Sequence, residues 1–193
     1  MRLRHNGAEI SVSFSFLMFN ALVFMMRDTK QILAFYAVCA LHEAGHLAAA
    51  AAFGTKLRAV GLSGTGIRLV TEKKPLRPVS HGAVILAAGP AVNIILYIVL
   101  KIMRCSGAFT LLNLGAAVYN LLPYSQLDGG ALIHLFTDCT KFESLTERLL
   151  NCLYFGISLS LLIMTCIYGK IFLPLFAVSV LLFITELKSF HRA

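Results

Sequence analysis

The sequence predicts an all-α polytopic membrane protein, formed as a single domain with about six transmembrane helices and one short β-hairpin after the second helix. Hydrophobic residues make up 58% of its 193 residues and charged residues only 13%, about half the charged fraction of a typical globular chain. Several apolar runs approach the roughly 20 residues that cross a bilayer. Only one stretch between these runs has β-prone pieces around a turn.

Five of the apolar runs are continuous. They cover about residues 10–26, 31–53, 81–103, 149–168 and 171–187. The first follows Met-Arg-Leu-Arg-His, a start that resembles a signal peptide. Because no small-residue cleavage site closes this run, we expect a retained membrane helix.

The remaining run, the fourth along the chain, covers residues 108–136 and is broken. Its first part ends near Leu122, and its roughly 15 residues reach only about 22 Å as a helix. Asn120, Pro123 and Asp128 therefore fall on irregular backbone inside the membrane. Such backbone is tolerated only within protein or beside a water-filled cavity, so the break predicts an internal polar site.

Residues 54–80 form the β-prone stretch, which we expect to be cytoplasmic or membrane-associated. Two pieces, 57–62 and 67–71, flank Ser-Gly-Thr-Gly, which is a hairpin signal. One interpretation is a basic surface loop attracted to anionic lipid. The other is a strand edge, with Ile67 and Leu69, that pairs with an extended substrate. The sequence leaves both open.

The basic residues are distributed unevenly about the apolar runs. Most lie in the N-terminal tail, residues 54–80, residues 137–148 and the C-terminal tail. The positive-inside rule then predicts a multi-pass integral membrane protein with both termini in the cytoplasm. This topology signal explains the net charge of +8 better than a nucleic-acid partner does. The five cysteines are odd in number and lack CxxC spacing, which argues against a disulfide framework.

The second run contains His-Glu-Ala-Gly-His, residues 42–46. His42 and His46 are four apart, so on a helix they share one face and can bind one Zn²⁺. Glu43 lies beside them and can accept a proton from the attacking water. The alternative is a stray histidine pair with a nearby glutamate. Three ionisable residues in a membrane segment are costly and usually functional, which favours a zinc site.

A catalytic zinc site needs a third protein ligand. Asp128, in Leu-Asp-Gly-Gly, is the best-placed carboxylate because it follows the broken segment and two glycines allow close packing around it. Its alternative role is the N-cap of a helix that starts near Gly129. The other acids lie in a charged, solvated segment or near the end of the last run; they are Asp138, Glu143, Glu147 and Glu186.

Three motifs together resemble the site-2 protease family of intramembrane zinc metalloproteases. They are His-Glu-Ala-Gly-His, the stretch Asn-Leu-Leu-Pro-Tyr-Ser-Gln-Leu-Asp-Gly-Gly (120–130) and Ala-Ala-Gly-Pro-Ala-Val-Asn (87–93). The layout is most similar to the stage IV sporulation protein FB branch. The chain ends shortly after its last apolar run, so neither the CBS domain of that branch nor a PDZ domain is expected.

The resemblance implies zinc ligands at His42, His46 and Asp128, with Glu43 as general base. Asn120 would hydrogen-bond the substrate backbone or the developing oxyanion. Asn93 would assist similarly or make an inter-helix hydrogen bond, and Pro123 belongs to the substrate-binding motif. Gly89 and the proline after it are expected to allow close packing and a bend.

The function that the resemblance implies is cleavage of a membrane-embedded or membrane-associated protein in a bacterial cytoplasmic membrane. Release of a transcription regulator, such as a sigma-factor precursor or an anti-sigma factor, would follow. The lipid bilayer and a membrane inhibitor protein are further expected partners. The main alternative is a zinc or ion transporter that uses the same cluster; a third is an inert binder. Because the polar residues cluster at one depth, hydrolysis is favoured over transport.

Overall fold

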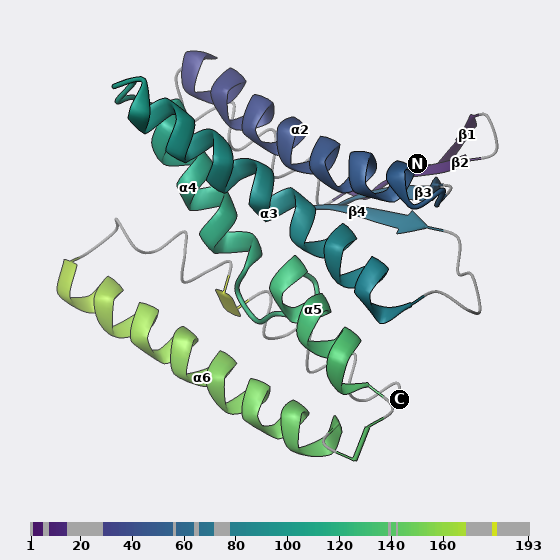
Figure 1. The fold of residues 1–193 in the computed structure, drawn as a ribbon. Helices are drawn as coiled ribbons and strands as arrows, with labels where there is room; N and C mark the ends of the chain where they lie inside the picture. Colours follow the sequence, from purple (N-terminus) through teal and green to yellow (C-terminus); the bar gives the residue numbers. More distant parts are fainter. Residues whose placement is uncertain are drawn as a thin grey trace. The chain divides into compact units, whose positions relative to one another are not determined.

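The computed structural model describes residues 2–5, 8–14, 29–55, 57–63, 66–71, 78–138, 140–141, 143–168 and 179–180. The chain divides into two compact units, residues 1–121 and residues 122–193. Figure 1 shows the helices and strands of both. Each unit is described by itself.

Three helices form the body of the first unit (Figure 1). They are α2 (Thr29–Ala52), α3 (Val79–Ile102) and α4 (Ala108–Asn120). Helix α2 packs along α3, and α4 contacts both. The approach of α2 to α3 depends on Gly45, because a Cβ there would lie 2.7 Å from the carbonyl oxygen of Ala88. Small residues at such crossings let helix backbones come close together without a clash.

The same unit contains a four-stranded sheet, with two strands before α2 and two after it. Its strands are β1 (Arg2–His5), β2 (Ala8–Val12), β3 (Leu57–Ser63) and β4 (Gly66–Thr71), in the order β1-β2-β3-β4. Strands β1 and β2 pair antiparallel, as do β3 and β4, whereas β2 and β3 pair parallel. A register shift lies between Leu57 and Ala59. In Figure 1 the sheet lies at the C-terminal end of α2.

Strands β1 and β2 correct the sequence analysis, which predicted only the two strands after α2. Ile10–Val12 belongs to β2 and not to the start of a membrane helix; the rest of that predicted run lies mainly outside the described residues. The alternation Glu-Ile-Ser-Val has the period of a strand, but the long apolar run after it concealed the pattern. Asn6-Gly7, between the two strands, is a strong hairpin signal that the analysis missed.

The second unit contains α5 (Asp128–Thr137) and α6 (Glu143–Tyr168), which contact each other. Helix α6 starts six residues before the predicted run, so residues 143–148 are helical and not a loop. The charged residues in this stretch lower its hydropathy, so the apolar run did not include it. Glu143 lies in the first turn of α6, where the helix dipole favours a negative charge. The predicted run 171–187 lies outside the described residues, apart from residues 179–180, which are helical.

Three of the described helices are long and apolar enough to cross a membrane. They are α2, α3 and, in α6, Glu143–Ile167. Large apolar side chains such as Ile95, Ile98 and Phe155 are exposed on α3 and α6, as expected for surfaces that face lipid. The chain thus has the helices of an integral membrane protein and is mostly helical. The total of six spanning helices stays a prediction.

Candidate metal centre

The histidine pair lies buried on one face of α2. His42 and His46 are 5% and 7% exposed, and their rings cross edge to face at 83° with centroids 4.8 Å apart. Their Nε2 atoms are 3.2 Å apart. The spacing of four residues produces this geometry because it places both side chains on the same stripe of the helix.

Helix α3 contacts the other nitrogen of each imidazole. Nδ1 of His46 is 2.7 Å from the carbonyl oxygen of Ile85, and Nδ1 of His42 is 3.3 Å from the side-chain amide of Asn93. A carbonyl oxygen only accepts hydrogen bonds, so Nδ1 of His46 must donate. In a neutral ring this leaves the lone pair on Nε2, the atom that faces His42.

Gly89 brings the α3 backbone against both rings. A Cβ on Gly89 would lie 2.3 Å from Nε2 of His46 and 2.8 Å from Cε1 of His42. The prediction that Gly89 permits close packing is confirmed. The groups that pack against Gly89 are the two histidine rings. Pro90 follows within the helix and is also buried. On the side of α3, the site is therefore lined by main-chain atoms, which restrict the movement of the two rings.

The residues present fit a zinc ion. Two nitrogens bound to zinc at about 2.0–2.1 Å in tetrahedral geometry lie about 3.3 Å apart, and the two Nε2 atoms are separated by 3.2 Å. Neutral imidazoles are common zinc ligands, and each of these has its outer nitrogen engaged by a second group, as metal-binding histidines do.

The two predicted catalytic residues of this unit lie on α2 and α4. Glu43 follows His42 directly on α2 and is half-buried. Asn120 is the last residue of α4, where its Nδ2 donates to the carbonyl oxygen of Ala116 at 3.0 Å. One N–H of that amide is therefore engaged by its own helix, and the second N–H is the group that could bind another acceptor.

In the second unit, Asp128 is the first residue of α5 and is half-buried. The N-cap of this helix is Leu127, with no side-chain capping bond. The alternative role of Asp128 as the N-cap is therefore wrong. Instead, its carboxylate lies in the first turn, where the helix dipole favours a negative charge.

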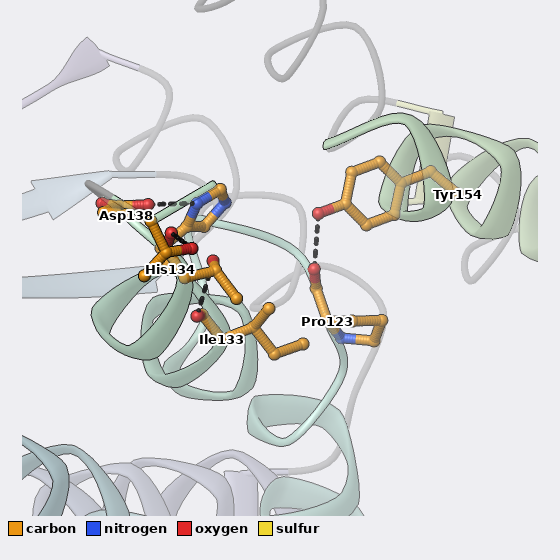
Figure 2. Close-up of polar contacts among 7 residues, drawn as sticks. Pro123, Ile133, His134, Asp138 and Tyr154 are labelled. Atoms are coloured by element: carbon orange, nitrogen blue, oxygen red, sulfur yellow. Dashed lines mark hydrogen bonds and ion pairs between the residues drawn. The ribbon is translucent and has the colours of Figure 1, made fainter. Parts of the chain in front are cut away.

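The segment before α5 is fixed by Tyr154 of α6. The Tyr154 hydroxyl donates to the carbonyl oxygen of Pro123 at 2.5 Å, as Figure 2 shows, and its ring stacks on Tyr124 with centroids 4.5 Å apart. Gly130 is equally constrained, because a Cβ there would lie 2.1 Å from the carbonyl oxygen of Tyr124. No sequence motif pointed to Tyr154. The sequence feature that could have indicated its role is a tyrosine inside an apolar run, because a buried tyrosine hydroxyl needs a hydrogen-bond partner.

The acids that the sequence set aside and the two strand residues make different contacts. Asp138 pairs with His134 at 3.2 Å on the surface of the second unit (Figure 2), while Glu143 is an exposed residue of α6. Ile67 and Leu69 belong to β4, where they pair with Leu62 and Val60 of β3. Glu186 lies outside the described residues.

Comparisons with known proteins show similar sequences and similar structures. The chain is 29% identical over 150 residues to stage IV sporulation protein FB of Bacillus subtilis, covering 70% of this chain and 52% of that protein. It is 31% identical over 109 residues to a Synechocystis protein named as a candidate zinc metalloprotease, covering 51% of this chain and 28% of that protein. The chain thus spans about half the length of the first relative and less of the second. No family model matches.

One similar structure is the site-2 protease from Methanocaldococcus jannaschii. The TM-score is 0.68 at 22% sequence identity, and the match covers 97% of this chain and 94% of that one. This likeness shows that the two chains share a fold. Sequence and fold point the same way, and the resemblance to the site-2 protease family that the motifs indicated is confirmed.

Proposed function

We propose that this chain is an intramembrane zinc metalloendopeptidase of the site-2 protease type, with Zn²⁺ held by His42, His46 and Asp128. The observation that carries the proposal is the buried histidine pair, whose Nε2 atoms are separated as two zinc ligands would be. The two named relatives and the shared fold support the same reading. A carboxylate as third ligand leaves one position for water or substrate.

The chemistry follows from the residues around the pair. When bound, Zn²⁺ supplies a Lewis acid that activates water and polarises the scissile carbonyl. Glu43, adjacent to His42, accepts the proton of the attacking water and later donates a proton to the leaving amine. The second N–H of Asn120 hydrogen-bonds the developing oxyanion or the substrate backbone, which stabilises charge without adding one.

Substrate binding requires an extended peptide, because the peptide bonds of a helix are shielded. Strand β4 is at one end of the strand order, so its outer edge can pair with a locally unwound substrate along Ile67 and Leu69. Pro123 would contact the substrate near the site. The prediction that Asn93 also contacts substrate has less support, since its side chain is completely buried.

The proposed orientation places the sheet in the cytoplasm of a bacterial cell. Because β2 pairs with β3, the N-terminal strands and the strands after α2 share one side of the membrane. Arg2, Arg4, Arg58 and Arg68 all belong to this sheet, and basic segments stay on the cytoplasmic side. The N-terminus would then be cytoplasmic, and six spanning helices would place the C-terminus on the same side. The substrate would be a membrane-embedded or membrane-associated protein, cleaved to release a transcription regulator, and a membrane inhibitor protein could bind the same enzyme.

The decisive experiment compares the wild-type protein with Glu43→Gln. Both are purified in detergent with zinc and offered a panel of single-helix membrane substrates. We expect only the wild type to cleave, and both proteins to contain one zinc. If neither protein cleaves and both move zinc across vesicle membranes, the protease proposal fails and the transporter alternative holds.

The third ligand has its own test. Asp128→Asn removes the proposed ligand, whereas Asp138→Asn is the matched control, because Asp138 pairs with His134 on the surface. We expect Asp128→Asn to lose about tenfold or more in zinc affinity and Asp138→Asn to retain it. Equal zinc affinity in the two variants would remove Asp128 from the site.

A further inference from the structure

We infer that Asn93 is a positioning residue of the metal centre, with its Oδ1 accepting a hydrogen bond from Nδ1–H of His42. This inference rests on the proposed zinc site and adds the group that fixes one of its ligands. Asn93 is 0% exposed and is brought to His42 by the packing of α3 against α2.

The side-chain amide of Asn93 shows a mismatch as it is placed. Its Nδ2 lies 3.3 Å from Nδ1 of His42, while its buried Oδ1 has no hydrogen-bond partner in the part of the chain that the structure describes. In this orientation the amide would donate to Nδ1 of His42, which puts the ring proton on Nε2. The Nε2–H would then point towards Nε2 of His46, only 3.2 Å away.

Turning the amide by half a rotation places Oδ1 against Nδ1 of His42 and moves the NH₂ group to the position that Oδ1 now occupies. The oxygen and nitrogen of an asparagine amide are nearly indistinguishable in shape, so their assignment follows from the hydrogen bonds. In the turned orientation Oδ1 accepts from Nδ1–H of His42. Among the described residues Oδ1 accepts no hydrogen bond where it now lies, so the turn breaks no bond at that position.

The two histidines then have matching tautomers. Nδ1–H of His46 donates to Ile85, Nδ1–H of His42 donates to Asn93, and both Nε2 lone pairs face each other. Two lone pairs at 3.2 Å repel unless a cation lies between them. Helix α3 therefore prepares both rings for metal, with a neutral amide at Asn93 where a carboxylate would add a charge inside the membrane.

The test measures zinc affinity of the full-length protein in detergent by competition with a chromophoric chelator. Asn93→Leu removes the acceptor at similar size, and Asn93→Asp keeps it. Asn113→Leu is the matched control, because Asn113 is also 0% exposed with an unpartnered Oδ1 but donates within its own helix. We expect Asn93→Leu to bind zinc about 10–100-fold more weakly, Asn93→Asp to recover most of that loss, and Asn113→Leu to bind as the wild type does.

A cobalt-substituted sample separates positioning from folding. The visible absorption of Co²⁺ reports ligand geometry, so Asn93→Leu should shift the bands and Asn113→Leu should not. Unchanged affinity and bands in Asn93→Leu, or an equal loss in Asn113→Leu, would overturn the inference. If Asn93→Leu does not fold, ¹⁵N NMR of the zinc-loaded wild type provides the test. A proton on Nδ1 of His42 would support the role of Asn93, and an unprotonated Nδ1 would overturn it. A wild type that binds no zinc would overturn the proposed function as well.

Discussion

Gly89 of α3 and His46 of α2 lie so close together that a Cβ on residue 89 would be 2.3 Å from Nε2 of the histidine. Any side chain at this position would compete with the imidazole for the same space. The site is therefore bounded by main chain on this side, and its dimensions depend on the backbone of α3.

Gly89→Ala should consequently disrupt metal binding. The added methyl group must push His46 and His42 aside, so we expect about tenfold or greater loss of zinc affinity and no cleavage. Gly115→Ala is the control, since a Cβ there meets none of the described residues within 4 Å. Zinc content by mass spectrometry and chelator competition measure the effect. A Gly89→Ala protein with wild-type affinity would show that the rings can move freely.

Gly130→Ala should destabilise the second unit. Its Cβ would overlap the carbonyl oxygen of Tyr124, which belongs to backbone and cannot rotate away, so the segment before α5 must shift. We expect a cost of about 1–3 kcal/mol, as for other overpacked sites, read as a lower thermal midpoint. On α6, the Cβ of Gly156→Ala would meet no described residue within 4 Å, so this variant should not lower the midpoint, because alanine favours a helix over glycine. Equal midpoints in the two variants would contradict the predicted overlap.

Tyr154→Phe isolates one hydrogen bond. The substitution keeps the ring that stacks on Tyr124 but leaves the Pro123 carbonyl without its donor. An unpaired buried acceptor costs about 1–3 kcal/mol, so the thermal midpoint and the cleavage rate should both fall. Tyr97→Phe, at a half-buried position of α3, is the comparison and should change neither. Wild-type values in Tyr154→Phe would mean that the stacking alone holds Pro123.

Leu69→Pro tests pairing of the substrate with β4. Proline removes a backbone N–H and disturbs an edge strand, so cleavage should slow while zinc content stays constant. Leu3→Pro makes the same change on β1, at the opposite end of the strand order, and should leave cleavage near the wild-type rate. If both variants slow cleavage equally, the loss of sheet stability explains the result. Such a result would contradict the proposed pairing of the substrate with β4.

Local sequence signals predicted several helices and the shared face of the histidine pair. The spacing of four between His42 and His46 predicted the shared helix face, and helical periodicity needs no knowledge of distant residues. Residue Asn120 ends α4 within two residues of the predicted end, since the apolar run stops there. The hydropathy pattern predicted α2 and α3 equally closely, because both are apolar throughout.

Contacts between distant segments could not be predicted in this way. The sequence predicted close packing at Gly89 but did not predict that the two histidines are its neighbours. It also predicted a possible inter-helix hydrogen bond of Asn93 but did not identify the partner residue. Tyr154 and Pro123 are far apart in sequence and meet through packing. Such pairs depend on how helices cross, which composition and spacing do not determine.

The parallel pairing of β2 with β3 also imposes an order of assembly. Glu9 pairs with Ala59, and all of α2 lies between them. During synthesis β2 therefore emerges long before its partner, and the central pairing closes only after the helix that carries both histidines has been made. Because such distant contacts form slowly, the sheet is expected to be completed late, so the edge proposed to receive substrate would become available only after the metal helix is in place.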